Sequence, residues 1–80
     1  MSAFSVDFVS PIDFEHLAAE ICYDGQIVCR IKSERGDGEL EVDFLHDLIE
    51  PIRPLSFSYS EFLRLLEDVA EEVRSLRRKG

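Results

Sequence analysis

Hydrophobic and polar residues follow a helical period near the end of the chain, over residues 57–78. Apolar residues recur there every three or four positions, so they share one helix face: Phe62, Leu65, Leu66, Val69, Val73 and Leu76. Ser58 followed by Glu61 is a capping box, and Phe57 is placed to pack on Phe62 as a hydrophobic staple. The pattern predicts an amphipathic helix that starts at Ser58, runs almost to Gly80 and buries one face.

Before this helix, apolar and polar residues alternate as they do in half-buried strands. Phe4, Val6 and Phe8 define a first strand, which Ser10-Pro11 ends. A last strand over residues 39–44 follows a glycine-rich turn and has an apolar inward side, Leu40, Val42 and Phe44, and an acidic outward side, Glu39, Glu41 and Asp43.

Between these strands, Asp24-Gly25 indicates a hairpin over residues 17–31. A two-residue turn would put Glu20 on the more apolar side of this hairpin. A three-residue turn from Tyr23 to Gly25 instead gathers six apolar residues on one side: Leu17, Ala19, Ile21, Ile27, Cys29 and Ile31. Because a slip of one residue moves a whole strand's side chains to the other side, we expect the three-residue turn.

Together these elements predict a single domain over residues 1–80 with an α+β fold. Its two layers are a four-stranded antiparallel β-meander and a C-terminal helix that covers one face of it. Residues 45–56 include two prolines and follow no single period, so we expect a packed connection with a helical turn near Asp47. A helix over residues 14–22 remains an alternative, although the hairpin signal after it favours a strand.

The net charge of −8, from 17 acidic and 9 basic residues, is unevenly distributed. Residues 1–55 hold 12 acids and 4 bases, whereas residues 56–80 hold 5 of each. The segment from Glu34 to Glu50 contains seven acids and a single base, Arg35. This charge opposes binding to nucleic acid, whose phosphates attract Lys and Arg, and it steers a basic protein toward residues 34–50.

We therefore expect residues 34–50 to form a docking surface for the lysines and arginines of a partner. The candidate residues are Asp37, Glu39, Glu41, Asp43, Asp47 and Glu50. A solvated strand whose charges discourage edge-to-edge aggregation is the alternative interpretation. Tyr23 at the hairpin tip and Tyr59 in the first helical turn are candidate anchors, because buried aromatic residues supply much of the energy of an interface.

Catalytic motifs are missing from the sequence: it has no Gly-rich phosphate loop, no nucleophile elbow and no metal-binding helix pair. His16 and His46 do not combine with the cysteines into a zinc-site spacing. We expect Cys29 in the core and Cys22 outside it, where acidic surroundings oppose thiolate formation. The prediction is a non-enzyme with no cofactor and no metal.

Two cysteines are too few for a disulfide scaffold and suit a reducing compartment. No apolar run approaches the roughly 20 residues needed to span a bilayer, and the start of the sequence lacks a charged-then-apolar leader. We expect a cytoplasmic protein that is neither exported nor bound to a membrane.

Three segments and the closing helix together resemble a small family of bacterial immunity proteins: DFVSP (Asp7 to Pro11), EICYDGQIVCRI (Glu20 to Ile31) and ELEVDF (Glu39 to Phe44). These proteins are the cytosolic partners of toxin domains delivered by contact-dependent growth inhibition. The resemblance covers nearly the whole chain and implies one-to-one neutralisation of a cognate toxin, often a basic nuclease. It assigns no residue roles, so the candidate site residues come from the charge distribution.

The alternative hypothesis is a small non-catalytic subunit or regulator of a larger assembly. Such a protein would bind through an edge strand or through the exposed side of the helix. The sequence leaves the oligomeric state open.

Overall fold

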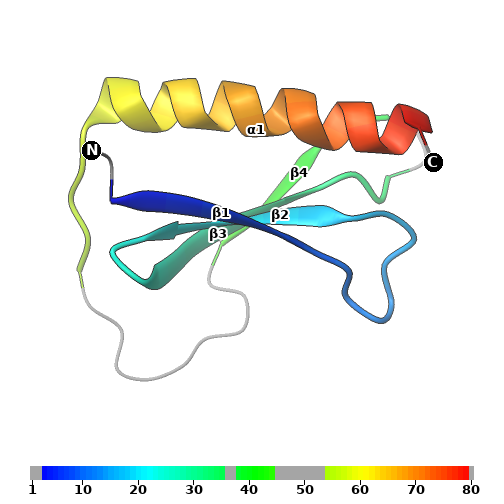
Figure 1. Ribbon diagram of the computed structural model, residues 1–80, viewed down its shortest axis with the longest axis horizontal. Coiled ribbons are helices and arrows are strands. Elements are labelled where there is room, and N and C mark those ends of the chain that lie inside the picture. Colours follow the sequence, from blue (N-terminus) through cyan, green and yellow to red (C-terminus); the bar gives the residue numbers. More distant parts are fainter. Residues whose placement is uncertain (1–2, 36–37, 45–53, 80) are drawn as a thin grey trace.

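The computed structural model describes residues 3–35, 38–44 and 54–79. Four strands, β1 (Phe4–Val9), β2 (Ala18–Tyr23), β3 (Gln26–Lys32) and β4 (Glu41–Phe44), form one antiparallel sheet in the order β1-β2-β3-β4. The helix α1 (Tyr59–Lys79) lies across one face of this sheet (Figure 1). The predicted α+β fold, a four-stranded meander covered by a C-terminal helix, is confirmed.

Ser58 caps α1 as predicted. Its side-chain Oγ accepts a hydrogen bond from the backbone N–H of Glu61 at 3.2 Å, and its carbonyl oxygen accepts one from the N–H of Phe62 at 3.0 Å. The rings of Phe57 and Phe62 lie 5.0 Å apart, so the hydrophobic staple also forms. Phe4 and Tyr23 pack on this pair and complete an aromatic cluster at the start of the helix.

The apolar face of α1 packs on the two central strands, β2 and β3. Six residues from these three elements form the buried core: Ala19, Ile21, Cys29, Ile31, Val69 and Val73. Removing this apolar surface from water is the main favourable term in folding a domain of this size. The helix periodicity therefore identified the buried face of α1, and the alternation placed Ala19, Ile21, Cys29 and Ile31 correctly on the buried side of the sheet.

The turn between β2 and β3 differs from the prediction. Asp24 and Gly25 have φ angles of 50° and 82°, as a two-residue hairpin turn with left-handed central residues requires, and Tyr23 pairs with Gln26 across them. The predicted three-residue turn is therefore wrong. The chain restores the apolar alignment by another device, a β-bulge within the hairpin.

At this bulge Cys22 pairs with Ile27, but Ile21 pairs with Cys29, so Val28 is the additional residue. Val28, and not Ile27, packs against the core as a result. Cys29 is buried and Cys22 belongs to the opposite side of the sheet, as predicted. Leu17 was expected in the core but precedes β2 and is exposed, whereas Ala18 is completely buried.

On the helix side, two rows of residues cross the whole sheet: Phe8, Ala19, Ile31 and Val42, and then Val6, Ile21, Cys29 and Phe44. The central members are buried under α1, but Phe8, Val42 and Phe44 are 45%, 46% and 62% exposed. Val42 and Phe44 thus lie on the predicted side without being buried, because α1 does not reach the edge strand β4. β4 also begins two residues later than predicted.

Candidate functional site

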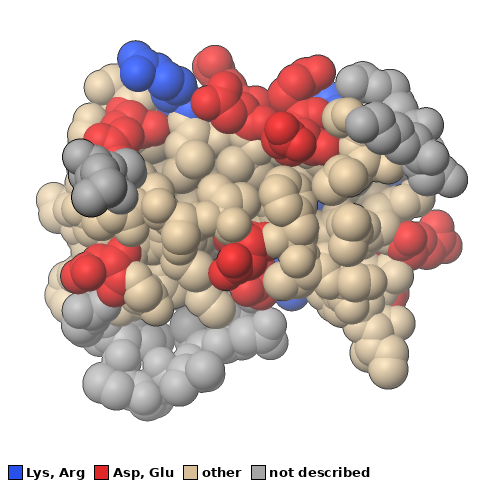
Figure 2. All heavy atoms as spheres, viewed as in Figure 1, with Lys and Arg blue, Asp and Glu red and all other residues tan. Residues whose placement is uncertain are grey.

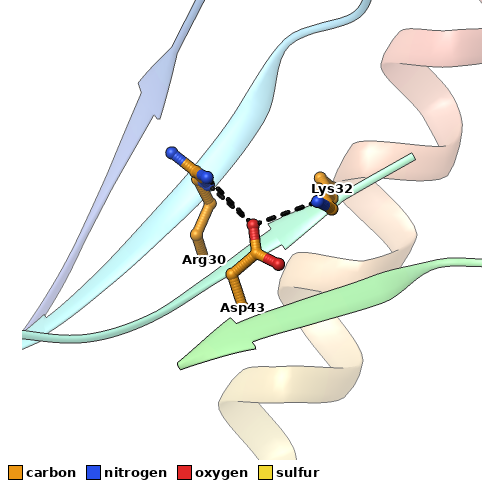
Figure 3. Close-up of polar contacts among 3 residues, drawn as sticks. All are labelled: Arg30, Lys32 and Asp43. Carbon is orange, nitrogen blue, oxygen red and sulfur yellow. Dashed lines mark hydrogen bonds and ion pairs between the residues drawn. The ribbon is translucent and has the colours of Figure 1, made fainter. Parts of the chain in front are cut away.

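The side of the sheet that faces away from α1 carries a row of charged residues. In register across the four strands, the row is Asp7, Glu20, Arg30 and Asp43. One carboxylate oxygen of Asp43, Oδ2, lies 2.9 Å from the Arg30 guanidinium and 3.2 Å from Lys32 Nζ (Figure 3). Both bases belong to β3 and Asp43 belongs to β4, so the ion pairs tie these two strands together on the outer side.

These ion pairs are largely shielded from solvent, since the side chains of Arg30, Lys32 and Asp43 are only 14%, 22% and 25% exposed. Burial alone would raise the pKa of Asp43. The hydrogen bonds and positive charges of Arg30 and Lys32 outweigh it and lower the pKa of this carboxyl. The ring of Phe14 lies 4.8 Å from the Arg30 guanidinium and 5.5 Å from Lys32 Nζ, a cation–π arrangement that covers both bases.

Phe14 belongs to the connection between β1 and β2, which descends on the side of the sheet away from α1 (Figure 1). The carboxylate of Glu34 holds this connection by accepting hydrogen bonds from the backbone N–H groups of Glu15 and His16, at 2.7 and 2.9 Å. The hydrogen bond from Glu15 is the main cause of a lowered pKa of Glu34, and the hydrogen bond from His16 adds to it. Together they outweigh desolvation, which acts in the opposite direction. A hollow of about 480 Å³ lies between the connection and the charged row.

Of the predicted partner-binding residues, Asp37, Asp47 and Glu50 lie outside the described residues, as does the helical turn expected near Asp47. Glu39 is exposed and Glu41 is half-buried opposite Lys32. Asp43 is paired with Arg30 and Lys32 of the neighbouring strand β3. The sequence could not indicate these pairs, because the spacing of residues along β4 does not show which bases of β3 lie beside them.

Tyr23, the predicted hairpin anchor, packs into the aromatic cluster with its ring 4.8 Å from Phe4 and 4.9 Å from Phe57. It is therefore half-buried at the start of the helix, whereas Tyr59 is exposed. A role of either tyrosine in partner binding stays a prediction.

Exposed charge on the described side chains is strongly acidic. Ten acids are exposed: Asp7, Asp13, Glu15, Asp24, Glu39, Glu61, Glu67, Asp68, Glu71 and Glu72. Only three bases among the described side chains are exposed: Arg35, Arg64 and Arg74. Acidic side chains gather along the side of the molecule where α1 lies (Figure 2). Half of the ten belong to this helix, which the sequence reasoning did not select.

The sequence did not indicate an acidic surface on the helix because the charges of residues 56–80 sum to zero. Its charges are nevertheless segregated along the axis, with the five acids over residues 61–72 and four of the five bases over residues 74–79. The order of the charges, rather than their sum, was the available signal. An acidic patch on a helix can attract a partner even when bases at the helix end cancel its charge in the total.

In the part of the chain that the structure describes, neither the cysteines nor the metal-ligating side chain types are arranged for a reactive thiol or a metal site. Burial, and the charges of Asp7 and Glu20, raise the pKa of Cys22, and burial raises that of Cys29 to about 11. Both shifts disfavour the reactive thiolate. No three His, Cys, Asp or Glu side chains among residues 3–35, 38–44 and 54–79 are grouped to hold a metal ion.

Comparisons with known proteins give no assignment, because no protein-family model matches the chain and no curated protein or solved structure matches it significantly. Within the described residues, no helix has the length and apolar character needed to cross a membrane. The described residues form a small α+β fold whose exposed charged side chains are mostly acidic.

Proposed function

We propose that this chain is an immunity-type protein that binds a basic toxin domain, most simply a nuclease, and neutralises it by covering its active site or substrate surface. The observation that carries the proposal is the imbalance of exposed charge, ten acids against three bases on the described side chains. In this proposal the protein is not an enzyme. Its carboxylates occupy the positions that nucleic-acid phosphates would take on the toxin.

The intramolecular ion pairs account for part of this imbalance. Arg30 and Lys32 lie on β3, the strand next to β4, and both are paired with Asp43. These two bases are half-buried and are therefore not among the three exposed bases of the described side chains. A surface of one sign accelerates association with a partner of the opposite sign by about 10- to 1,000-fold at low salt.

The pKa shifts of Asp43 and Glu34 do not favour either residue as a general acid. A carboxyl group that acts as a general acid near neutral pH needs a raised pKa. The pKa values of Asp43 and Glu34 are both lowered, by the cations beside one and the backbone N–H groups on the other. These two carboxylates are engaged within the fold, and the proposal assigns the other acids, exposed or half-buried, to the partner.

The test is a growth-rescue assay with a basic domain encoded next to this chain in its genome. Cells that express the basic domain alone are expected to stop growing, and coexpression of the wild-type chain is expected to restore growth. Charge reversal at Glu39→Lys with Glu41→Lys is expected to slow association at least tenfold and to weaken the rescue. Association rates of the purified proteins, measured at low and high salt, give the quantitative readout.

The matched control is Asp13→Lys with Glu15→Lys, which changes the net charge equally at two exposed acids of the β1–β2 connection. If both double variants bind and rescue equally, net charge alone drives the interaction and the surface around β4 has no special role. Failure of the wild-type chain to bind or neutralise the basic domain would refute the proposed function.

A second candidate function is that of a non-catalytic subunit or regulator in a larger assembly. The observation that favours it is the exposure of Val42 and Phe44 side by side on the edge strand β4. This hypothesis predicts self-association, which sedimentation velocity over a range of protein concentrations would detect. A strictly monomeric protein would count against its oligomeric form.

A further inference from the structure

The edge strand β4 presents two exposed apolar side chains, Val42 and Phe44, on the helix side of the sheet. Val42 and Phe44 stand in register with the buried residues Ile31 and Cys29 of β3, so they continue the two core rows beyond the cover of α1. Phe44 is the most exposed of the aromatic side chains in the sheet. One more strand alongside β4 would lie beside both apolar side chains.

The other side of β4 carries two acids, Glu41 and Asp43. Glu41 lies opposite Lys32 in the register, but the Lys32 ammonium is directed to Asp43, at 3.2 Å. Asp43 itself is turned toward the two cations of β3 (Figure 3). Glu41 is thus the acid of β4 that neither base of β3 is directed to, while the apolar pair lies on the other side of the strand.

We propose that β4 is the docking edge for an extended segment of the partner in which apolar residues alternate with Lys or Arg. Strands that add to a sheet gain main-chain hydrogen bonds, and the alternation of their side chains gives specificity. The apolar residues would pack beside Val42 and Phe44, and the basic residues would lie beside Glu41. This inference rests on the proposed function, because it takes the partner to be basic.

Two neighbouring alternatives fit the described surface less well, the first on charge and the second on apolar area. In an antiparallel pairing of β4 with β4 of a second copy, the Glu41 residues of both copies share one side of the joined sheet, where like charges repel. The opposite edge, β1, offers less apolar surface: Phe8 is exposed, but Val6 and Phe4 pack against the core and Phe4 also lies within the aromatic cluster.

The test uses the full chain, labelled for NMR, and three short synthetic peptides. One alternates lysine and valine, the second has the same composition with its lysines and valines in two separate blocks, and the third alternates glutamate and valine. The lysine–valine alternating peptide is expected to give saturable shifts of the amide signals of residues 41–44. The block peptide is expected to bind more weakly and without this localisation, and the glutamate peptide not to bind.

Variants then test the apolar half of the edge. Phe44→Ser is expected to weaken binding of the alternating peptide about two- to fivefold, the effect of losing an aromatic cross-strand pair. The matched control is Phe8→Ser, which removes a similarly exposed phenylalanine from the same side of the sheet at β1. This control is expected to leave binding unchanged, and thermal melting curves check that both variants are folded.

Equal binding of the two lysine peptides would overturn the strand-docking inference and leave the acidic-surface proposal standing, since composition rather than alternation would then decide affinity. Shifts located on β1, binding of the glutamate peptide, or no binding of any peptide would also overturn it. Because growth rescue is measured separately, failure of the docking inference and failure of the proposed function give different results.

Discussion

On the helix side of the sheet, Ile21, Cys29 and Val73 are almost completely buried, whereas on the outer side Arg30, Lys32 and Asp43 all keep some contact with water. The first group is stabilised by apolar burial, which is non-directional and insensitive to pH. The second depends on charge and on the geometry of a few hydrogen bonds. One thin sheet thus has a face that determines stability and a face whose contribution can be altered by pH.

The largest expected effect belongs to the helix side. Ile21→Ala removes a fully buried side chain from between β2, β3 and α1 and should cost about 2–5 kcal/mol of unfolding free energy, through lost transfer energy and the cavity left behind. Urea unfolding followed by far-UV circular dichroism measures this loss.

Phe44→Ala is the control for that substitution, because Phe44 is on the same side of the sheet but mostly exposed. Its loss of stability should be clearly smaller than that of Ile21→Ala. Equal losses would mean that burial under α1 does not distinguish the centre of the sheet from its edge.

The next largest effect is expected on the outer side. Asp43→Asn removes the shared counter-charge and leaves Arg30 and Lys32 next to each other with little access to water. Because the substitution removes charged hydrogen bonds and the compensating negative charge, it should lower the free energy of unfolding by roughly 1–3 kcal/mol. The same urea experiment measures it, and added salt should reduce the difference from wild type.

Glu71→Gln is the matched control for this ion pair. It removes the acid of a pair with Arg74 at 3.6 Å, in which both side chains are mainly exposed. Exposed pairs contribute little, so this variant should stay close to wild type. If it loses as much as Asp43→Asn, shielding from solvent does not set the strength of these pairs.

A smaller effect is the pH dependence of the outer side. The pKa of Asp43 is lower in the folded state than its usual value of about 3.9, so its stabilising contribution is complete above about pH 4 and disappears as the pH falls through the folded-state pKa. Urea midpoints between pH 7 and pH 3 should therefore fall more in wild type than in Asp43→Asn. The urea midpoint of Ile21→Ala should change with pH as steeply as that of wild type. If the midpoint of Asp43→Asn also changes with the wild-type slope, Asp43 is not the source of this pH dependence.

The sequence predicted most of the helix side because local signals and burial agree there. Ser58 and Glu61 mark the helix start, and the spacing of Val69 and Val73 selects the buried stripe. The hairpin was harder, because Ile27 and Val28 are adjacent and equally apolar, so alternation cannot tell which of them a bulge turns inward.

The outer side was predicted less well because its contacts cross between strands. Asp43 was expected to be part of an open acidic row, yet Arg30 and Lys32 engage it from β3. Only the register of β3 and β4 brings these three residues together, and that register depends on the turns between the strands. Phe14 is a similar case, since nothing near it in the sequence indicates that it covers two bases.

The smallest expected effect concerns Glu34, which stabilises the β1–β2 connection locally rather than the fold as a whole. Glu34→Gln replaces charged acceptors with a neutral amide, and charge-assisted hydrogen bonds are roughly twice as strong as neutral ones. The backbone amides of Glu15 and His16, which donate to Glu34, should therefore exchange with deuterium faster, while global stability changes little. Glu67→Gln on the exposed side of α1 is the control and should leave both exchange rates unchanged. Unaltered exchange in Glu34→Gln would mean that the packing of Phe14 on Arg30 and Lys32 alone holds the connection against the outer side.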